Sequence, residues 1–464
     1  MKRLLLFLMC FTVSCSVGPN YKRPSASAPP AFKEQPPDGW KQAQPNDAFA
    51  KGKWWEIYND PALNVLEEQV GISNQNVLQA EARLRQARAA IREARSALFP
   101  TVGGSVGITQ SRAGISNGVN TSGARTTYSL PFDVSWEPDL WGSLRRGVTA
   151  NTALAQASQA VLANTRLLFQ AELAQDYFQL HGIDSEIDLL NRTVASYEEF
   201  LTLTRNRYAA GVVSDLDVAQ AESQLYTTQS ELIDLGQQRA SLEHAIAILT
   251  GKAPADVSVA PALLQTPPPP VPVGVPSDLL ERRPDIAASE RNVAAANEEI
   301  GIAMAAYYPL ATLSATGGLQ SSNFVKWFSL PSRFWSVGPQ LAQTLFDAGR
   351  RRSILVQQQA AYDATVAGYR QTVLTAFGQV EDNLAALRIL ETETDKVQQT
   401  IQAANRALSV SSAQYRAGTT SYLTVITTQA TLLGSERSAV TLLTRRLTAS
   451  VLLIEALGGG WSGL

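Results

Sequence analysis

Two short stretches decide the fold: Tyr-Ala-Ala-Gly-Val-Val-Ser at residues 208–214 and Tyr-Arg-Ala-Gly-Thr-Thr-Ser at residues 415–421. They lie 207 residues apart, and other stretches recur at nearly the same offset. A repeat at a fixed offset indicates that one structural unit occurs twice in the chain. The glycine in each stretch suits a left-handed helix end, and the serine suits the start of a new helix. Each stretch therefore predicts a tight turn between two helices.

Long helical patterns lead into and out of both turns. No proline interrupts residues 144–208 or 350–415, and at 1.5 Å per residue each helix would reach about 100 Å. Apolar residues recur at heptad spacing along both, which is typical of coiled-coil packing. They are Ile183, Ile187, Leu190, Val194, Tyr197, Leu201 and Tyr208, then Leu390, Val397, Ile401, Ala404, Leu408 and Tyr415. We expect shorter helices to return through residues 214–250 and 421–457.

A shorter helix and two strands precede each long helix. Residues 61–98 and 285–306 are rich in Ala and Glu, and Pro100 and Pro309 should stop these helices. Strict alternation of apolar and polar residues then predicts strands that are apolar on one face. The alternating stretches are residues 102–109, 128–137, 312–319 and 335–341.

Aromatic residues gather at the ends of these strands, as in the interfacial girdles of outer-membrane barrels. The candidate girdle residues are Trp136, Trp141, Trp327 and Trp335. Four strands cannot close a barrel, and open strand edges cannot face lipid. The chain must therefore share a barrel with further copies of itself, unless its strands form an ordinary sheet on a soluble core.

The N-terminus has the pattern of an export signal. Lys2 and Arg3 precede an apolar run that ends at Val13, and the following residues resemble a lipoprotein cleavage box. We expect residues 1–14 to be removed and Cys15 to carry a covalent lipid. A plain signal peptide with an incidental cysteine is the alternative. No later segment has 18 apolar residues in a row, so we expect any membrane crossing to be made by strands.

Composition argues against enzymes and nucleic-acid binding. The 464 residues include only two histidines and two cysteines, too few for most metal or thiol chemistry. With 39 basic and 41 acidic residues and no basic block, nothing predicts nucleic-acid binding. We expect no cofactor other than the lipid on Cys15.

Four motifs carry a resemblance to a known family. They are Val-Gly-Pro-Asn-Tyr at residues 17–21, Trp54-Trp55, Asp60-Pro61, and Pro-Ser-Asp-Leu-Leu-Glu-Arg-Arg-Pro-Asp at residues 276–285. The chain resembles TolC/OprM-like outer-membrane factors, in the lipoprotein branch named after NodT. The resemblance spans residues 15–458 and keeps the family's order of elements.

This resemblance implies an α+β membrane protein. Three copies would form a 12-stranded barrel, four strands per chain, that continues into a long periplasmic α-helical barrel. The homotrimer would lie in the bacterial outer membrane, anchored by its lipid and extending into the periplasm. It would be a passive exit duct for drugs, metals or other small toxic compounds, working with a periplasmic adaptor protein and an inner-membrane pump of the RND type. An exit duct for type I protein secretion and a lipid-anchored periplasmic coiled-coil protein are the alternatives.

The resemblance also implies two functional sites at the helix turns. The turn residues would dock the adaptor: Ala210, Gly211, Val212, Ala417, Gly418 and Thr419. Tyr415 and Asp217 would hold the periplasmic gate closed, with Thr424 and Thr427 at the positions of the family's acidic ring. Thr420 stands where related channels carry a basic latch residue, which argues against a salt-bridged lock.

The two repeats and the proline-rich segment between them divide the mature chain into five parts. They are a lipid-anchored arm at 15–55, a first repeat at 56–260, a proline-rich linker at 261–284, a second repeat at 285–458 and a tail at 459–464.

Overall fold

The computed structural model describes residues 16–26, 28–37, 52–112, 123–271, 276 and 282–460. The chain forms two compact units, and each combines segments from both halves of the sequence. Unit 1 holds the described residues among 1–25, 83–158 and 288–369, and unit 2 those among 26–82, 159–287 and 370–464. The boundaries between units therefore differ from the repeat boundaries expected from the sequence.

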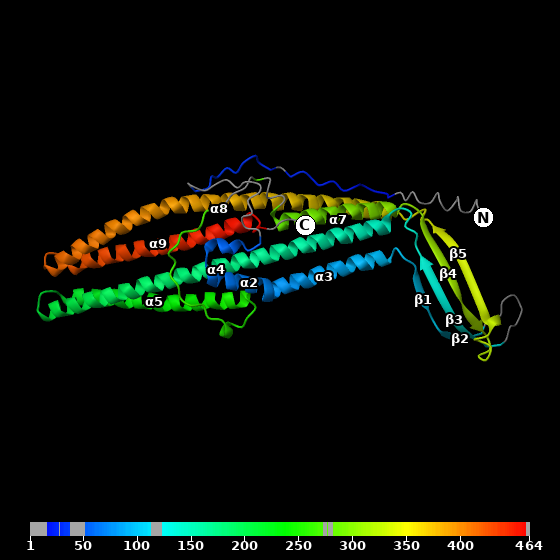
Figure 1. The fold of residues 1–464 in the computed structure, drawn as a ribbon, viewed down its shortest axis with the longest axis horizontal. Coiled ribbons are helices and arrows are strands. Elements are labelled where there is room, and N and C mark those ends of the chain that lie inside the picture. The colour runs from blue at the N-terminus through cyan, green and yellow to red at the C-terminus, as the bar shows by residue number, and fades with distance from the viewer. Residues whose placement is uncertain are drawn as a thin grey trace. The chain divides into compact units, whose positions relative to one another are not determined.

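Unit 1 contains one antiparallel sheet, visible in Figure 1. The strands run in the order β1-β3-β4-β5, and β2 also pairs with β3. Their bounds are β1 (Thr101–Gly104), β2 (Gly107–Ser111), β3 (Arg125–Trp136), β4 (Leu310–Ser321) and β5 (Arg333–Ala342). All four alternating stretches of the sequence thus form strands.

The first expected strand is split into β1 and β2. Gly104 pairs with Phe132 and Gly107 with Ser129, so the register continues unchanged across the split. Pro131 lies opposite the gap and has no N–H to donate, although its carbonyl still accepts from the Ser105 N–H at 3.2 Å. β1 and β2 therefore occupy one strand position in the sheet, here called a lane. The sheet has four such lanes.

The strand register separates an apolar face from a polar one. Val134, Ala315 and Val337 are aligned across β3, β4 and β5 on the apolar face. On the opposite face the Thr316 hydroxyl donates to Asp133 Oδ1 at 2.7 Å. The apolar face is open in the single chain, since Val337 is 63% exposed.

The helices follow the predicted lengths closely. α4 (Ser143–Ala209) and α8 (Arg350–Arg416) each have 67 residues, while α5 (Asp215–Leu249) and α9 (Tyr422–Ala456) each have 35. The shorter helices are α2 (Pro61–Ser73), α3 (Gln75–Ser96) and α7 (Pro284–Ala305), with 3₁₀ turns at η2 (Trp54–Tyr58), η3 (Pro254–Asp256) and η5 (Leu330–Ser332). Within the described residues, none of these helices has both the length and the apolar character that a membrane span requires.

The prediction of a single helix over residues 61–98 is wrong, because Asn74 divides this stretch into α2 and α3. Asn74 is buried, and its side-chain amide donates to the Leu249 carbonyl at 2.8 Å. Its Oδ1 accepts from the N–H groups of Asn76 and Val77, which open α3. A side chain that bonds local backbone competes with a continuous helix, so the break follows from this network.

Candidate functional site

The helix turns close by the same hydrogen bonds in both halves. Gly211 has φ +73° and Gly418 has φ +77°, the left-handed region that favours glycine. Gly211 N–H donates to the Tyr208 carbonyl at 2.8 Å, and Val212 N–H donates to the Arg207 carbonyl at 2.9 Å. This is a Schellman ending, which satisfies the last carbonyls of the helix. The N–H groups of Gly418 and Thr419 form the equivalent hydrogen bonds in the second turn.

All six predicted docking residues lie exposed at these turns, namely Ala210, Gly211, Val212, Ala417, Gly418 and Thr419. No heavy atom would come within 4 Å of a Cβ placed on Gly211. At Gly418 the nearest atom to such a Cβ is the Arg207 guanidinium at 3.3 Å. The two turns therefore leave backbone accessible to a partner, more openly at Gly211.

Tyr415 lies inside the helix core of unit 2 rather than at an open aperture. Its side chain is 1% exposed, and its ring centroid lies 5.3 Å from that of Tyr422. The phenol and the Thr204 hydroxyl lie 3.1 Å apart and share a hydrogen bond. Burial, reinforced by Tyr415 and Tyr197, raises the pKa of Tyr422. The surrounding core joins α4, α5, α8 and α9.

Asp217 caps the helix on which it lies. Its Oδ2 accepts from both the backbone N–H and the hydroxyl of Ser214, each at 3.0 Å. This reciprocal arrangement is a capping box, which fixes the start of α5. Asp217 and Tyr415 therefore do not form the predicted contact within one chain, because each side chain already has a nearer partner.

Thr424 and Thr427 lie exposed on the first turns of α9. The Thr427 hydroxyl donates to the Thr424 carbonyl at 2.9 Å, and Thr420 donates to the Thr424 hydroxyl at 3.2 Å. Thr424 also borders an open groove of about 560 Å³ between α8 and α9. The hydroxyls of Thr424 and Thr427 are thus neutral hydrogen-bonding groups. They stand at the positions where an acidic ring would bind cations.

Sequence reasoning missed Arg207 as a partner of Tyr415. The Arg207 guanidinium lies 4.6 Å from the centre of the Tyr415 ring and donates to the Tyr415 carbonyl. The available signal was a departure from the repeat, because Gln414 occupies the equivalent position in the second half. Such a departure marks a contact that only one half makes.

In unit 1, the described chain begins at Ser16, directly after the predicted lipid site. Cys15 and residues 1–14 lie outside the described residues. Val17 N–H donates to the Trp141 carbonyl at 3.0 Å, and the Val17 carbonyl accepts from buried Arg146 at 2.8 Å. Arg146 also pairs with Glu298 at 2.6 Å. The N-terminal segment is thus fixed against α4 and α7 immediately after the predicted lipid site.

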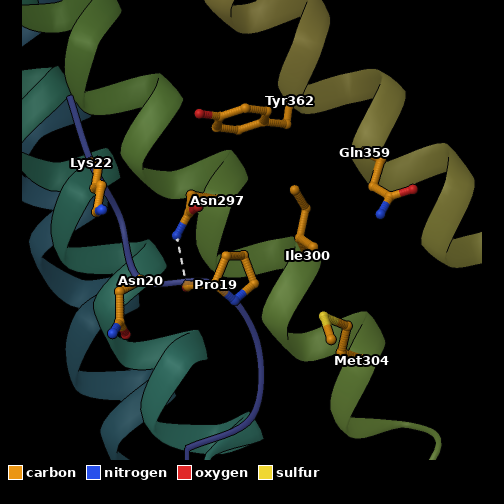
Figure 2. Close-up of a pocket in the computed structure, with 8 residues that line it drawn as sticks. All are labelled: Pro19, Asn20, Lys22, Asn297, Ile300, Met304, Gln359 and Tyr362. Atoms are coloured by element: carbon orange, nitrogen blue, oxygen red, sulfur yellow. Dashed lines mark hydrogen bonds between the residues drawn. The ribbon is translucent and has the colours of Figure 1, made fainter. Parts of the chain in front are cut away.

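Figure 2 shows the groove that this segment helps to form. The Asn297 amide donates to the Pro19 carbonyl at 3.2 Å and ties the segment to α7. Ile300 and Met304 of α7 line an open groove of about 470 Å³ together with Gln359 and Tyr362 of α8. Its lining has no nucleophile with a neighbouring base. Among the described residues, no three His, Cys, Asp or Glu side chains converge as a metal site.

The four predicted girdle tryptophans lie toward opposite ends of the sheet. Trp136 ends β3, and Trp141 follows and stacks on Tyr308 with ring centroids 4.8 Å apart. Trp327 and Trp335 lie toward the other end, at the connection between β4 and β5 and near the start of β5. Trp335 is 80% exposed, whereas Trp327 is 6% exposed because neighbouring aromatic rings cover it.

Residues 67–252 and 275–459 match the family model described as "Outer membrane efflux protein". This chain belongs to the outer membrane efflux protein family. It is 30% identical over 452 residues to the antibiotic efflux pump outer membrane protein ArpC of Pseudomonas putida, covering 96% of this chain and 93% of the relative. It is 29% identical over 469 residues to the pyoverdine export outer membrane protein OpmQ of Pseudomonas aeruginosa, covering 99% of this chain and 97% of that protein.

Solved structures of outer-membrane channels share the fold of this efflux family member. The outer-membrane channel OprN superposes with a TM-score of 0.89 at 30% identity, covering 97% of this chain and all of that one. VceC from Vibrio cholerae gives a TM-score of 0.82 at 26% identity, covering 89% of this chain. The α+β architecture and the outer-membrane location expected from the sequence are therefore confirmed, and the alternative of a periplasmic structural protein is wrong.

Proposed function

We propose that three copies of this efflux protein form the outer-membrane exit duct of a tripartite pump. The duct conducts small molecules passively. A pump in the inner membrane and a periplasmic adaptor supply the energy and the cargo. A lipid on Cys15 anchors each chain in the outer membrane.

The open sheet carries this proposal. In the described residues, the outer edges of β5 and of the β1 and β2 lane pair with no further strand. Unpaired backbone groups are costly next to lipid, so a sheet that is apolar on one face must close on itself. Joining the free edges of three four-lane sheets gives a 12-stranded barrel, with the apolar face outward and the polar face lining the duct.

The helices supply the periplasmic part of the proposed duct. At 1.5 Å per residue, the 67 residues of α4 or α8 extend about 100 Å. From the strands onward the second half repeats the order of the first, with two strand lanes, a 67-residue helix and a 35-residue helix, and we attribute this to internal duplication. A trimer with two such halves per chain would surround the duct with six similar helix pairs. Six similar pairs can pack around a narrow, symmetric aperture.

Small molecules are the proposed cargo. Relatives of this chain are named for antibiotic efflux and for pyoverdine export. Protein secretion is the other candidate, and no feature of the described residues favours it. A knockout of this gene should become more susceptible to small toxic compounds, and the intact gene should restore resistance. Unchanged susceptibility together with loss of a secreted protein would favour the secretion duct instead.

The proposed gate lies at the turn end of the helices. Tyr415 and Asp217 hold their own helix ends in place, by core packing and by capping. Thr424 and Thr427 are exposed there and face the aperture in the proposed trimer. The gate would then close through the packing of helix ends and not through a salt bridge.

The turn glycines test adaptor docking directly. Gly211→Phe and Gly418→Phe should abolish efflux while the amount of trimer stays normal, because a bulky side chain blocks the approach of a partner. Gly211→Asn is the matched control, since Asn tolerates positive φ and keeps the turn. Normal efflux in the Phe variants would rule out docking at these turns, whereas loss of trimer would assign the glycines to folding alone.

A further inference from the structure

The far rim of the sheet, meaning the end away from the helices, carries only positive charge. There is no Asp or Glu between Pro100 and Asp133 or between Glu299 and Asp347. The basic residues in these two stretches are Arg112, Arg125, Lys326 and Arg333. All four lie where β2 ends, β3 begins, or β4 connects to β5. The whole chain is nearly balanced in charge, so this rim is a local exception that suits an anionic partner.

The strand register assigns two of these cations to opposite faces. Arg333 pairs with Leu319, which pairs with Leu130, so Arg333 lies on the apolar face. Arg125 lies four residues from Ser129 and shares the polar face with it. In the duct proposed above, Arg333 therefore faces lipid and Arg125 faces the lumen.

The connection between β4 and β5 forms an aromatic platform beside Arg333. Tyr128 contacts Phe324 and Trp327, with ring centroids 5.4 and 5.7 Å apart. The platform is anchored by the Ser332 hydroxyl, which donates to the Lys326 carbonyl at 2.7 Å. Its outer side chains are open: Phe324, Val325, Phe328 and Leu330 are 60, 88, 67 and 71% exposed.

Among the described residues, the cations on this platform have no acidic partner. In the described part of the chain, neither Lys326 nor Arg333 forms an ion pair, and the Arg333 guanidinium reaches only the Leu330 carbonyl at 3.3 Å. Exposed aromatic rings next to unpaired cations match the interface of a membrane, where rings lie at headgroup depth and cations meet phosphate. A soluble anion would bind the charges but would leave the apolar side chains in water.

We propose that Lys326, Arg333 and the exposed rings of Phe324 and Phe328 bind phosphorylated lipid headgroups of the outer leaflet. This inference rests on the proposed function, which places the apolar face against lipid. The two cations form charge-assisted hydrogen bonds with phosphate oxygens while the aromatic rings enter the acyl boundary. Each chain carries one such site at the external end of the barrel.

Lipid binding to the purified mature protein tests the site. The protein in detergent is titrated with diphosphoryl lipid A, and with lipid A whose phosphates have been removed, and bound lipid is counted by native mass spectrometry. We expect the phosphorylated lipid alone to bind, and Lys326→Gln with Arg333→Gln to weaken binding about tenfold or more. Arg125→Gln is the matched control, because it removes the same charge from the polar face and should leave binding unchanged.

The outcomes separate this site from the proposed function. If Arg125→Gln and the double variant lose lipid binding equally, the effect comes from net charge alone, and the proposal is overturned. Undiminished binding in the double variant would overturn it as well. Lys326→Arg with Arg333→Lys must retain binding, which guards against misfolding as the cause. The same spectra report the number of chains, so a failed trimer is recognised independently of lipid binding.

Discussion

At the scale of single residues, Glu67 of unit 2 is a buried acid. It lies on α2 and is fully buried, and neither carboxylate oxygen has a hydrogen-bond partner within the part of the chain that the structure describes. Burial raises the pKa of Glu67 well above its ordinary value of 4.5. Removing an unpaired carboxylate from water is costly, so the folded protein retains the proton at a pH where the unfolded chain has lost it.

Glu67 should therefore make the protein less stable as the pH rises. Below pH 4.5 both states are protonated, and above it the unfolded state ionises first. Stability then falls by up to about 1.4 kcal/mol per pH unit until the folded state also ionises. Glu67→Gln should raise the melting temperature at neutral pH and flatten this slope. Glu68→Gln, next to it and exposed, is the control, and equal pH profiles for Glu67→Gln and wild type would contradict this account.

Gly18 has both a strained φ and no room for a side chain. Its φ is +111°, and a Cβ there would lie 2.5 Å from the Gly301 Cα. Gly52 has a φ of +94° with nothing within 4 Å of its Cβ position. Alanine should cost about 1–2 kcal/mol at either site through φ, and about 1–3 kcal/mol more at Gly18 through overpacking. Thermal unfolding compares them, and equal losses would mean that the N-terminal segment is not packed against α7.

At the scale of elements, the proposed gate depends on how the helix ends are held. Asp217→Ala with Tyr415→Phe removes a capping box and a buried hydrogen bond, at about 1 kcal/mol each. We expect the loosened helix ends to raise single-channel conductance. Asp60→Ala with Tyr177→Phe is a matched control, because Asp60 caps α2 and accepts from the Tyr177 phenol at 2.7 Å. Conductance that stays at the wild-type level in the first variant would contradict the gate.

The sequence predicts elements well where their signal is local and repeated. The helices α4 and α8 follow from long proline-free heptad patterns, and the strands follow from alternation. The break at Asn74 was missed because its partner Leu249 lies 175 residues away. For the same reason, no local pattern predicted the Arg207 contact with Tyr415. Contacts between distant segments decide which partner a functional side chain has. The patterns of a single sequence carry no information about such contacts.

At the scale of the whole molecule, we propose that one chain is an incomplete channel. The sheet in the described residues has two open edges and an exposed apolar face, and further copies would pair the edges. Neither the cationic far rim nor the exposed turns could act in efflux unless the barrel closes.

The most direct test is the native mass of the mature protein extracted from outer membranes in detergent, corrected for bound detergent. We expect a mass of three chains, because three four-lane sheets close the barrel and satisfy every edge. A folded single chain that needs no detergent would contradict the account, since its apolar face would then have to be covered within the chain.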